Sequence, residues 1–219
     1  MITVKNLTKI YGKDDAGVRA LSECSIMFEH GKFTAIIGTS GSGKSTLLHL
    51  AAGLDSADKG EIFYDGTNIL SLKDAELSQF RLKNVGVVFQ FFNLIPELTA
   101  RENILLPLML DRSPVDTSYF ETLTDKLEIS NRLSHYPSQL SGGQQQRTAI
   151  ARALIHKPGI LLCDEPTGNL DSKSGTEVLD LLSSLQKSLG LTIVMVTHDE
   201  KIAAQADKIV RIEDGKICG

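Results

Sequence analysis

The stretch "GTSGSGKST" (38–46) lies between the apolar, β-rich "FTAIIG" (33–38) and the helical pattern "KSTLLHLAAG" (44–53). It fits G-x-x-x-x-G-K-[ST], in which glycines let backbone N–H groups wrap around phosphates. The helix that follows points its positive end at the same anion. In this pattern Lys44 reaches the β and γ phosphates, and the Ser45 hydroxyl ligates Mg²⁺. The alternative is an ordinary glycine-rich turn, but a strand before it and a helix after it favour a nucleotide site.

The residues predicted to surround the phosphates are therefore Gly38, Thr39, Ser40, Gly41, Ser42, Gly43, Lys44, Ser45 and Thr46.

Apolar strands that alternate with helical patterns predict an α/β fold with a mostly parallel sheet covered on both faces. "GILLCDEP" (159–166) and "LTIVMVTH" (191–198) have the continuous apolar character of buried parallel strands. Three other stretches alternate with period two, which predicts antiparallel strands on one flank. They are "ITVKNLTKIYG" (2–12), "ALSECSIMFEHGK" (20–32) and "GEIFYDGTNI" (60–69).

Residues 91–140 are helical in pattern and contain no convincing strand, so we expect an inserted helical subdomain. Its loops are expected at Pro96, Pro107, Pro114 and Pro137.

The helix between the two buried strands has a predicted apolar face and predicted ends. Ser174 and Glu177 have the spacing of a capping box, and Gly190 is the predicted stop. The apolar face consists of Val178, Leu181, Leu182, Leu185 and Leu189.

Composition excludes several classes of protein. The net charge of −4 gives no electrostatic footprint for nucleic acid, so we expect no nucleic-acid partner. Three scattered cysteines fit a reducing compartment. The start of the chain does not resemble a signal peptide, and the longest apolar run, 104–110, is shorter than the roughly 20 residues of a membrane span.

Carboxylates end one predicted strand, and polar side chains end two others. Burying a charge without a partner is costly, so Asp164 and Glu165 should lie at the open carboxyl end of their strand. There Asp164 is the candidate Mg²⁺ ligand and Glu165 the candidate general base. His198 ends a strand in the same sheet and could contact the γ-phosphate and orient Glu165. Gln90 ends "VGVVFQ" (85–90) and could contact both the metal and the attacking water.

Each of these four assignments has a simpler alternative. The two acids could form a solvated loop, and the histidine and the glutamine could be structural. Their position beside a phosphate loop favours the catalytic interpretation.

A second glycine pair occurs in "LSGGQ" (140–144), at the predicted start of another helix. Ser141 and Gln144 have capping-box spacing, so the stretch is a good helix start. Local structure does not require both Gly142 and Gly143, which indicates that this helix end approaches something closely.

Together these stretches resemble the ATP-binding cassette (ABC) ATPases, over essentially the whole chain. "GTSGSGKST" is similar to the Walker A loop, Gln90 to the Q-loop, "LSGGQ" to the ABC signature and "ILLCDE" (160–165) to the Walker B strand. "GNLD" (168–171), which ends in Asp171, is similar to the D-loop, and His198 to the switch histidine. Tyr11 matches the aromatic residue that stacks on adenine.

The resemblance implies a P-loop NTPase (RecA-like) fold in one ABC ATPase domain, 1–219. Residues 1–90 and 147–219 would form the nucleotide-binding core with its β flank. Residues 91–146 would form the helical subdomain that ends in the signature.

The resemblance also implies partners. Two cassettes face each other head to tail, and each ATP lies between the Walker A loop of one and the signature of the other. Ser141, Gly142, Gly143 and Gln144 would then bind the γ-phosphate of the second subunit, with Asp171 in the same interface. A separate integral membrane permease would dock near Phe91, Phe92 and Leu94, which otherwise would be subdomain core. The expected location is cytoplasmic, peripheral on the inner face of the membrane.

More narrowly, "FQFFNLIPELTARENILLPL" (89–108) and "DEPTGNLDSKSG" (164–175) resemble the macrolide-export, lipoprotein-release and bacitracin-detoxification group. This implies the ATP-hydrolysing subunit of a bacterial transporter for export or mechanotransmission, acting on an antimicrobial peptide, lipoprotein or drug. The alternative is a regulatory ATPase that activates a cell-wall hydrolase and transports nothing. A third class, soluble ABC ATPases of DNA repair or translation, needs a coiled-coil insertion or a second cassette, and neither is seen here.

Overall fold

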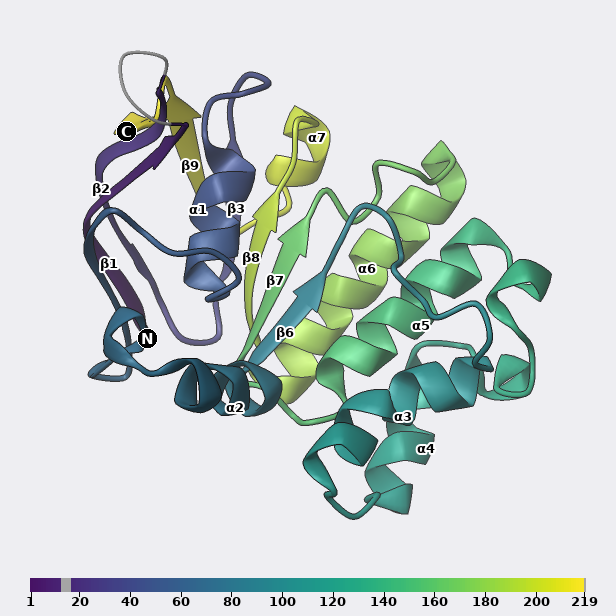
Figure 1. Cartoon of the computed structure of the whole chain (residues 1–219). Helices are drawn as coiled ribbons and strands as arrows, with labels where there is room; N and C mark the ends of the chain where they lie inside the picture. The colour runs from purple at the N-terminus through teal and green to yellow at the C-terminus, as the bar shows by residue number, and fades with distance from the viewer. Residues whose placement is uncertain (13–16, 219) are drawn as a thin grey trace.

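The computed structural model describes residues 1–12 and 17–218, which form two sheets and the helices around them (Figure 1). The larger sheet has six strands in the order β10-β9-β3-β8-β7-β6. Its parallel strands are β9 (Lys208–Glu213), β3 (Phe33–Ile37), β8 (Thr192–Val196), β7 (Ile160–Asp164) and β6 (Val85–Val88). At its edge β10 (Lys216–Cys218) pairs with β9 in antiparallel fashion.

The smaller sheet is antiparallel, with strands in the order β2-β1-β4-β5. These strands are β1 (Ile2–Tyr11), β2 (Val18–Phe28), β4 (Lys59–Tyr64) and β5 (Thr67–Asn68). Period-two alternation therefore located the antiparallel flank correctly.

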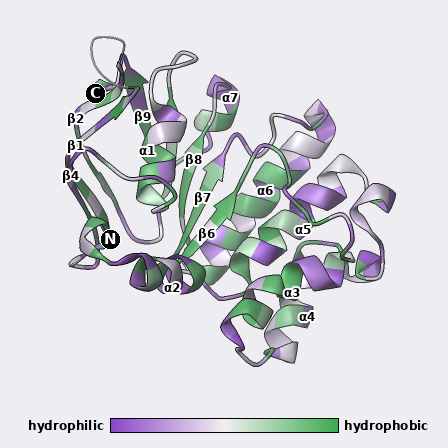
Figure 2. Ribbon diagram, viewed as in Figure 1, coloured by the Kyte–Doolittle hydropathy of each residue, from purple (hydrophilic) through white to green (hydrophobic). Residues whose placement is uncertain are grey.

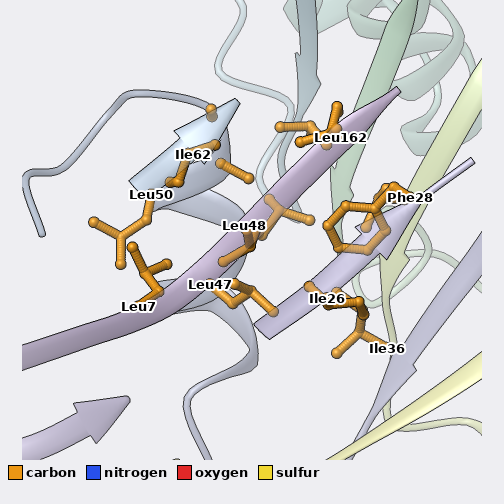
Figure 3. Close-up of a cluster of buried hydrophobic side chains, with 14 of the residues drawn as sticks. Leu7, Ile26, Phe28, Ile36, Leu47, Leu48, Leu50, Ile62 and Leu162 are labelled. Carbon is orange, nitrogen blue, oxygen red and sulfur yellow. The ribbon is translucent and has the colours of Figure 1, made fainter. Parts of the chain in front are cut away.

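Helix α1 (Lys44–Ala51) lies between the two sheets and fills the space between them (Figure 1). Leu47, Leu48 and Leu50 are fully buried there, against Leu7 of the smaller sheet and Ile36 of the larger one (Figure 3). This packing fixes the helix whose first turn belongs to the phosphate loop.

The opposite face of the larger sheet is covered by α5 (Gly142–Leu154) and α6 (Ser172–Leu189). Figure 2 shows hydrophobic residues concentrated along β6, β7 and β8 and on the helices beside them. Both faces of the parallel sheet are thus covered, which confirms the predicted layer arrangement.

The remaining α-helices are α2 (Asp74–Asn84), α3 (Ala100–Asp111), α4 (Thr117–Lys126) and the short α7 (Glu200–Ala203). Short 3₁₀ helices cover Ile69–Ser71, Ser130–Arg132 and Pro137–Gln139. Residues 91–140, all of them described by the structure, contain no strand. The prediction that Pro107 marks a loop is wrong, because Pro107 lies inside α3. Ile104 and Leu108 are buried on either side of Pro107, and their packing stabilises the helix although it contains a proline.

The prediction for α6 was partly wrong. Ser174 and Glu177 do not cap it, because Asp171 is the N-cap residue and its side chain accepts from the N–H groups of Lys173 and Ser174. Leu189 is 41% exposed, whereas Leu179 is buried. Gly190 does end the helix, with a left-handed φ of 64°.

Among the described residues, no helix has the length and apolar character required to cross a membrane.

Candidate nucleotide site

The phosphate loop wraps the first turn of α1, as the motif predicts. Gly43 is the N-cap residue with φ 102°, and a Cβ there would lie 2.3 Å from the carbonyl oxygen of Ala20. Only glycine fits this position without moving backbone. The Lys44 Nζ donates to the Thr39 carbonyl oxygen at 2.7 Å, so the lysine lies along the loop. The buried Ser42 hydroxyl has no partner in the described part of the chain, which suits a loop that binds an anion.

Two predicted metal ligands meet at the carboxyl end of β7. The Ser45 hydroxyl donates to the Asp164 Oδ1 at 2.9 Å. The described residues contain no group of three or more His, Cys, Asp and Glu side chains arranged to hold a metal. One hydroxyl and one carboxylate nevertheless fit Mg²⁺, which usually keeps water and phosphate oxygens as its other ligands.

His49 of α1 is a neighbour of this pair that the sequence did not indicate. Its Nε2 lies 3.3 Å from the Asp164 Oδ2, so Asp164 contacts α1 through both oxygens.

The predicted general base and switch histidine are in contact. The His198 Nδ1 lies 2.9 Å from the Glu165 Oε2, and the Glu165 N–H donates to the Val196 carbonyl oxygen at 3.0 Å. Glu165 has φ 46°, a strained left-handed conformation for a residue with a side chain, and such strain clusters at functional sites. Both residues line a cavity of about 460 Å³ together with Asp171 and Thr197.

Gln90 lies two residues beyond the end of β6 and contacts the segment after β7. Asn169 donates through Nδ2 to the Gln90 carbonyl oxygen at 3.0 Å, and the Gln90 Nε2 lies 3.4 Å from the Asn169 Oδ1. A Cβ on Gly168 would lie 2.9 Å from the Gln90 Nε2, so glycine gives the amide room. Sequence reasoning missed Asn169, because an asparagine in a loop has no local pattern that indicates its partner.

Two side chains of α5 attach this helix to the same region, and sequence reasoning missed both. The fully buried Gln146 donates through Nε2 to the Pro166 carbonyl oxygen at 2.6 Å. Arg152 donates to the carbonyl oxygens of Phe92 and Asn93 at 3.0 and 2.6 Å. The loop after Gln90 is therefore tied to the signature helix.

The capping box of the "LSGGQ" stretch forms as predicted. The Ser141 N–H donates to the Gln144 Oε1 at 3.0 Å, and the Gln144 N–H donates to the Ser141 Oγ at 3.3 Å. A Cβ on Gly143 would meet nothing closer than 3.5 Å, an ordinary contact. Packing within one chain therefore does not require Gly143 to be glycine.

Asp171 is satisfied by its own helix. Besides its two N–H contacts, it accepts from the Ser174 hydroxyl at 2.7 Å, and the bonds from Ser174 lower the pKa of its carboxyl. Its role in a nucleotide interface stays a prediction.

Tyr11, the predicted adenine-stacking residue, ends β1 and is 44% exposed. Its hydroxyl donates to the Asp55 Oδ2 at 2.7 Å. An exposed aromatic ring fixed at its hydroxyl end can serve as a stacking surface for a base.

The predicted docking residues differ in exposure. Phe91 is 69% exposed, whereas Phe92 and Leu94 are half-buried. The Phe92 ring lies 3.7 Å from the position of a Cβ on Gly142. Of these three residues, Phe91 is thus the most available to a partner.

Comparison with known proteins agrees with this geometry. The sequence model of the family described as "ABC transporter" matches residues 21–168. The chain is 44% identical over 222 residues to the lipoprotein-releasing system ATP-binding protein LolD of Syntrophotalea carbinolica, covering 100% of this chain and 97% of that protein. It is 42% identical over 217 residues to the macrolide export ATP-binding/permease protein MacB of Bdellovibrio bacteriovorus, covering 99% of this chain and 33% of that protein.

Solved structures confirm the predicted fold class. Two structures of the ABC transporter cassette MJ0796 each match with a TM-score of 0.89 and 41% identity, covering 99% of this chain and 96% of theirs. One is described as dimeric, and the other as a dimeric post-hydrolysis state bound to ADP and Pi.

Proposed function

The chain belongs to the ABC transporter family as an ATP-binding and ATP-hydrolysing cassette, and we propose that it works as a homodimer that drives a separate membrane permease. The observation that carries this proposal is the meeting of the phosphate loop with two strand ends. Ser45 contacts Asp164, and Glu165 contacts His198, at the carboxyl edge of one sheet.

In the proposed reaction, a water oxygen attacks the γ-phosphorus and the bond to the β–γ bridging oxygen breaks, releasing ADP and phosphate. The Glu165 carboxylate takes the proton that the water loses. Because His198 occupies the Glu165 Oε2, the Oε1 is left for the water. Lys44 neutralises charge on the phosphates, and Gln90 orders the γ-phosphate and the attacking water.

Mg²⁺ is the cofactor that this donor set would hold, through the Ser45 hydroxyl and the Asp164 carboxylate, which are in contact, and Gln90 is its third predicted ligand. When bound, it neutralises charge that develops on the phosphate oxygens.

The dimer is supported by the signature helix. The N–H groups of Gly142 and Gly143 lie in the first turn of α5, where an N–H has no acceptor within its own helix, and the glycines allow another molecule to approach them. We propose that these groups, with Ser141, bind the γ-phosphate held by the second subunit. Loss of that phosphate on hydrolysis would loosen the interface. The dimeric structure of the MJ0796 cassette supports the pairing of two such chains.

The helical region would connect hydrolysis to the permease. We propose that 91–146 acts as a subdomain against a core of 1–90 and 147–219. Helix α5 continues across the boundary between residues 146 and 147, from the subdomain into the core. Arg152 of this helix donates to the loop that contains Phe91. Docking there would place the chain at the inner face of a membrane.

The names of two relatives support a role in export, acting on a lipoprotein or a drug; export or mechanotransmission of an antimicrobial peptide stays a prediction. One relative is named for lipoprotein release and another for macrolide export. These names favour a transporter over the regulatory alternative.

The test of catalysis is Glu165→Gln. It should keep ATP binding and accumulate a dimer in size-exclusion chromatography, while turnover nearly disappears. Full ATPase activity in this variant would remove Glu165 from the role of base.

The test of docking is Phe91→Ala, with Met27→Ala as the control because Met27 is also exposed but lies on β2. A tagged Phe91→Ala chain should capture less permease from membranes than either the unaltered chain or the control. Equal capture by all three would contradict docking at Phe91.

A further inference from the structure

The turn that follows α1 is bonded to the end of β1. The Asp58 N–H donates to the Thr8 carbonyl oxygen at 3.0 Å, and the Ile10 N–H donates to the Asp58 Oδ2 at 2.6 Å. Two segments separated by the phosphate loop in sequence are thereby held together. One ends in Tyr11, and the other follows the helix that the phosphate loop begins.

Asp55, in the same turn, bonds to two side chains of β1 at once. Its Oδ1 accepts from the Lys9 Nζ at 2.8 Å, and its Oδ2 accepts from the Tyr11 hydroxyl at 2.7 Å. The Lys9 Nζ also donates to the Ser56 carbonyl oxygen at 2.6 Å and lies 4.9 Å from the centre of the Tyr11 ring. Tyr11 is therefore held at its hydroxyl by Asp55 and across its ring by Lys9.

The protonation states of the three groups suit this arrangement. Burial would raise the pKa of the Asp55 carboxyl, but the bonds from Lys9 and Tyr11 keep it below its ordinary value. The bond to Asp55 raises the pKa of Lys9, which is only 8% exposed. Burial and the same carboxylate raise the pKa of Tyr11, so its hydroxyl remains a donor.

We propose that Asp55 and Lys9 are positioning residues that hold the Tyr11 ring in place to stack on the base of the nucleotide. The proposal rests on the proposed function, in which Tyr11 contacts adenine. Without these contacts the exposed ring would lose rotamer freedom when the nucleotide binds, and that entropy cost would weaken binding. Because the turn follows α1, the contacts also tie the base-side ring to the helix that begins at the phosphates.

This role predicts a specific pattern of affinities. Every base has a face on which an aromatic ring can stack, so ATP and GTP should be affected equally. Inorganic tripolyphosphate has no base, so its binding should not change. A general disturbance of the phosphate loop would weaken tripolyphosphate as well.

The experiment measures dissociation constants for ATP, GTP and tripolyphosphate by calorimetry, with the full chain and Mg²⁺. Tyr11→Phe keeps the ring and removes its bond to Asp55. Asp55→Ala removes the bonds that Asp55 accepts from both Lys9 and Tyr11. Each should raise the dissociation constants of ATP and GTP by about two- to tenfold, the range for one or two net hydrogen bonds. In ATPase assays KM should rise and kcat should stay unchanged.

Three further variants complete the design. Lys9→Met removes the ammonium group that lies 4.9 Å from the centre of the Tyr11 ring and should weaken ATP and GTP binding as Asp55→Ala does. Lys5→Met is its matched control, because the Lys5 Nζ lies 4.8 Å over the Phe63 ring on the same flank but outside this cluster. It should leave all three constants unchanged. Tyr11→Ala reports on stacking itself and should weaken ATP more than Tyr11→Phe does.

The outcomes separate the two ideas. If Tyr11→Ala weakens ATP but Tyr11→Phe and Asp55→Ala do not, the positioning role is overturned and adenine stacking stands. If no variant changes the ATP constant, stacking by Tyr11 is overturned as well. Equal weakening of tripolyphosphate would also overturn the proposal. Should Asp55→Ala fail to fold, Tyr11→Phe alone decides, because it changes only one hydroxyl.

Discussion

Replacing Asn169 with alanine should slow ATP hydrolysis, because Asn169 is the side chain that holds Gln90. Its Nδ2 donates to the Gln90 carbonyl oxygen at 3.0 Å, and its Oδ1 lies 3.4 Å from the Gln90 Nε2. The first contact is a normal hydrogen bond and the second is long and weak. Asn169→Ala removes both, so it releases the Gln90 backbone and removes a weak contact of the Gln90 side-chain amide.

The magnitude follows from these two bonds. A net hydrogen bond contributes about 1 kcal/mol, and the long contact adds little. If that energy is lost only from the correctly ordered site, kcat should fall by about fivefold, because about 1.4 kcal/mol corresponds to a tenfold change in rate. Affinity for ATP should stay within about twofold of the unaltered chain, because the loss falls on the catalytic step.

The assay is steady-state ATPase kinetics with a direct binding measurement on the same protein. Asn84→Ala is the matched control, because Asn84 donates to the Phe80 carbonyl oxygen at 2.9 Å from the end of α2. It removes the same kind of bond outside the site and should leave kcat unchanged. The reasoning is refuted if Asn169→Ala keeps full kcat, or if its loss appears only as weaker ATP binding.

Other predictions concern the core and the N-terminus of α6. Leu47→Ala should lower the free energy of unfolding by about 2–5 kcal/mol because Leu47 is fully buried between the sheets. Leu54→Ala, at a side chain 47% exposed, should change it by about 0.5 kcal/mol or less. Urea unfolding of both variants at an unchanged m-value checks this, and equal losses of stability would contradict the assigned core. The bonds from Ser174 lower the pKa of Asp171 below 3.8 in the folded chain, so its contribution to stability is present above that pH and is lost as the pH falls through the folded value. Asp171→Asn should therefore make the free energy of unfolding depend less on pH below about 4. Urea titrations at several pH values measure this, and an unchanged pH dependence would show that protonation of Asp171 does not affect stability.

The phosphate loop and both strand-end carboxylates could be predicted because their chemistry depends on local spacing. The backbone geometry at position 43 requires glycine. Asp164 and Glu165 end a strand so apolar that it has to be buried, so the charged side chains have to lie at its open end. The antiparallel flank was visible because period two is a property of one strand at a time.

Contacts across long sequence separations could not be predicted in the same way. Asn169 meets Gln90 across 79 residues, and Asp55 meets Lys9 across 46. The start of α6 was misplaced because Ser174 and Asp171 both suit a cap, and local pattern alone did not decide between them. Pro107 was misassigned because the packing of α3 outweighs the preference of proline for a loop.

The central claim is that one copy of this chain holds only half of each catalytic site, and mixing two inactive variants tests it most directly. Ser141→Arg damages the signature but keeps its own Glu165, whereas Glu165→Gln damages the base but keeps its signature. In a head-to-tail pair of the two, one ATP faces an intact phosphate loop, an intact Glu165 and an intact signature from the other chain. The mixture should therefore hydrolyse ATP well above either variant alone, and a mixture as inactive as its two components would contradict the shared site.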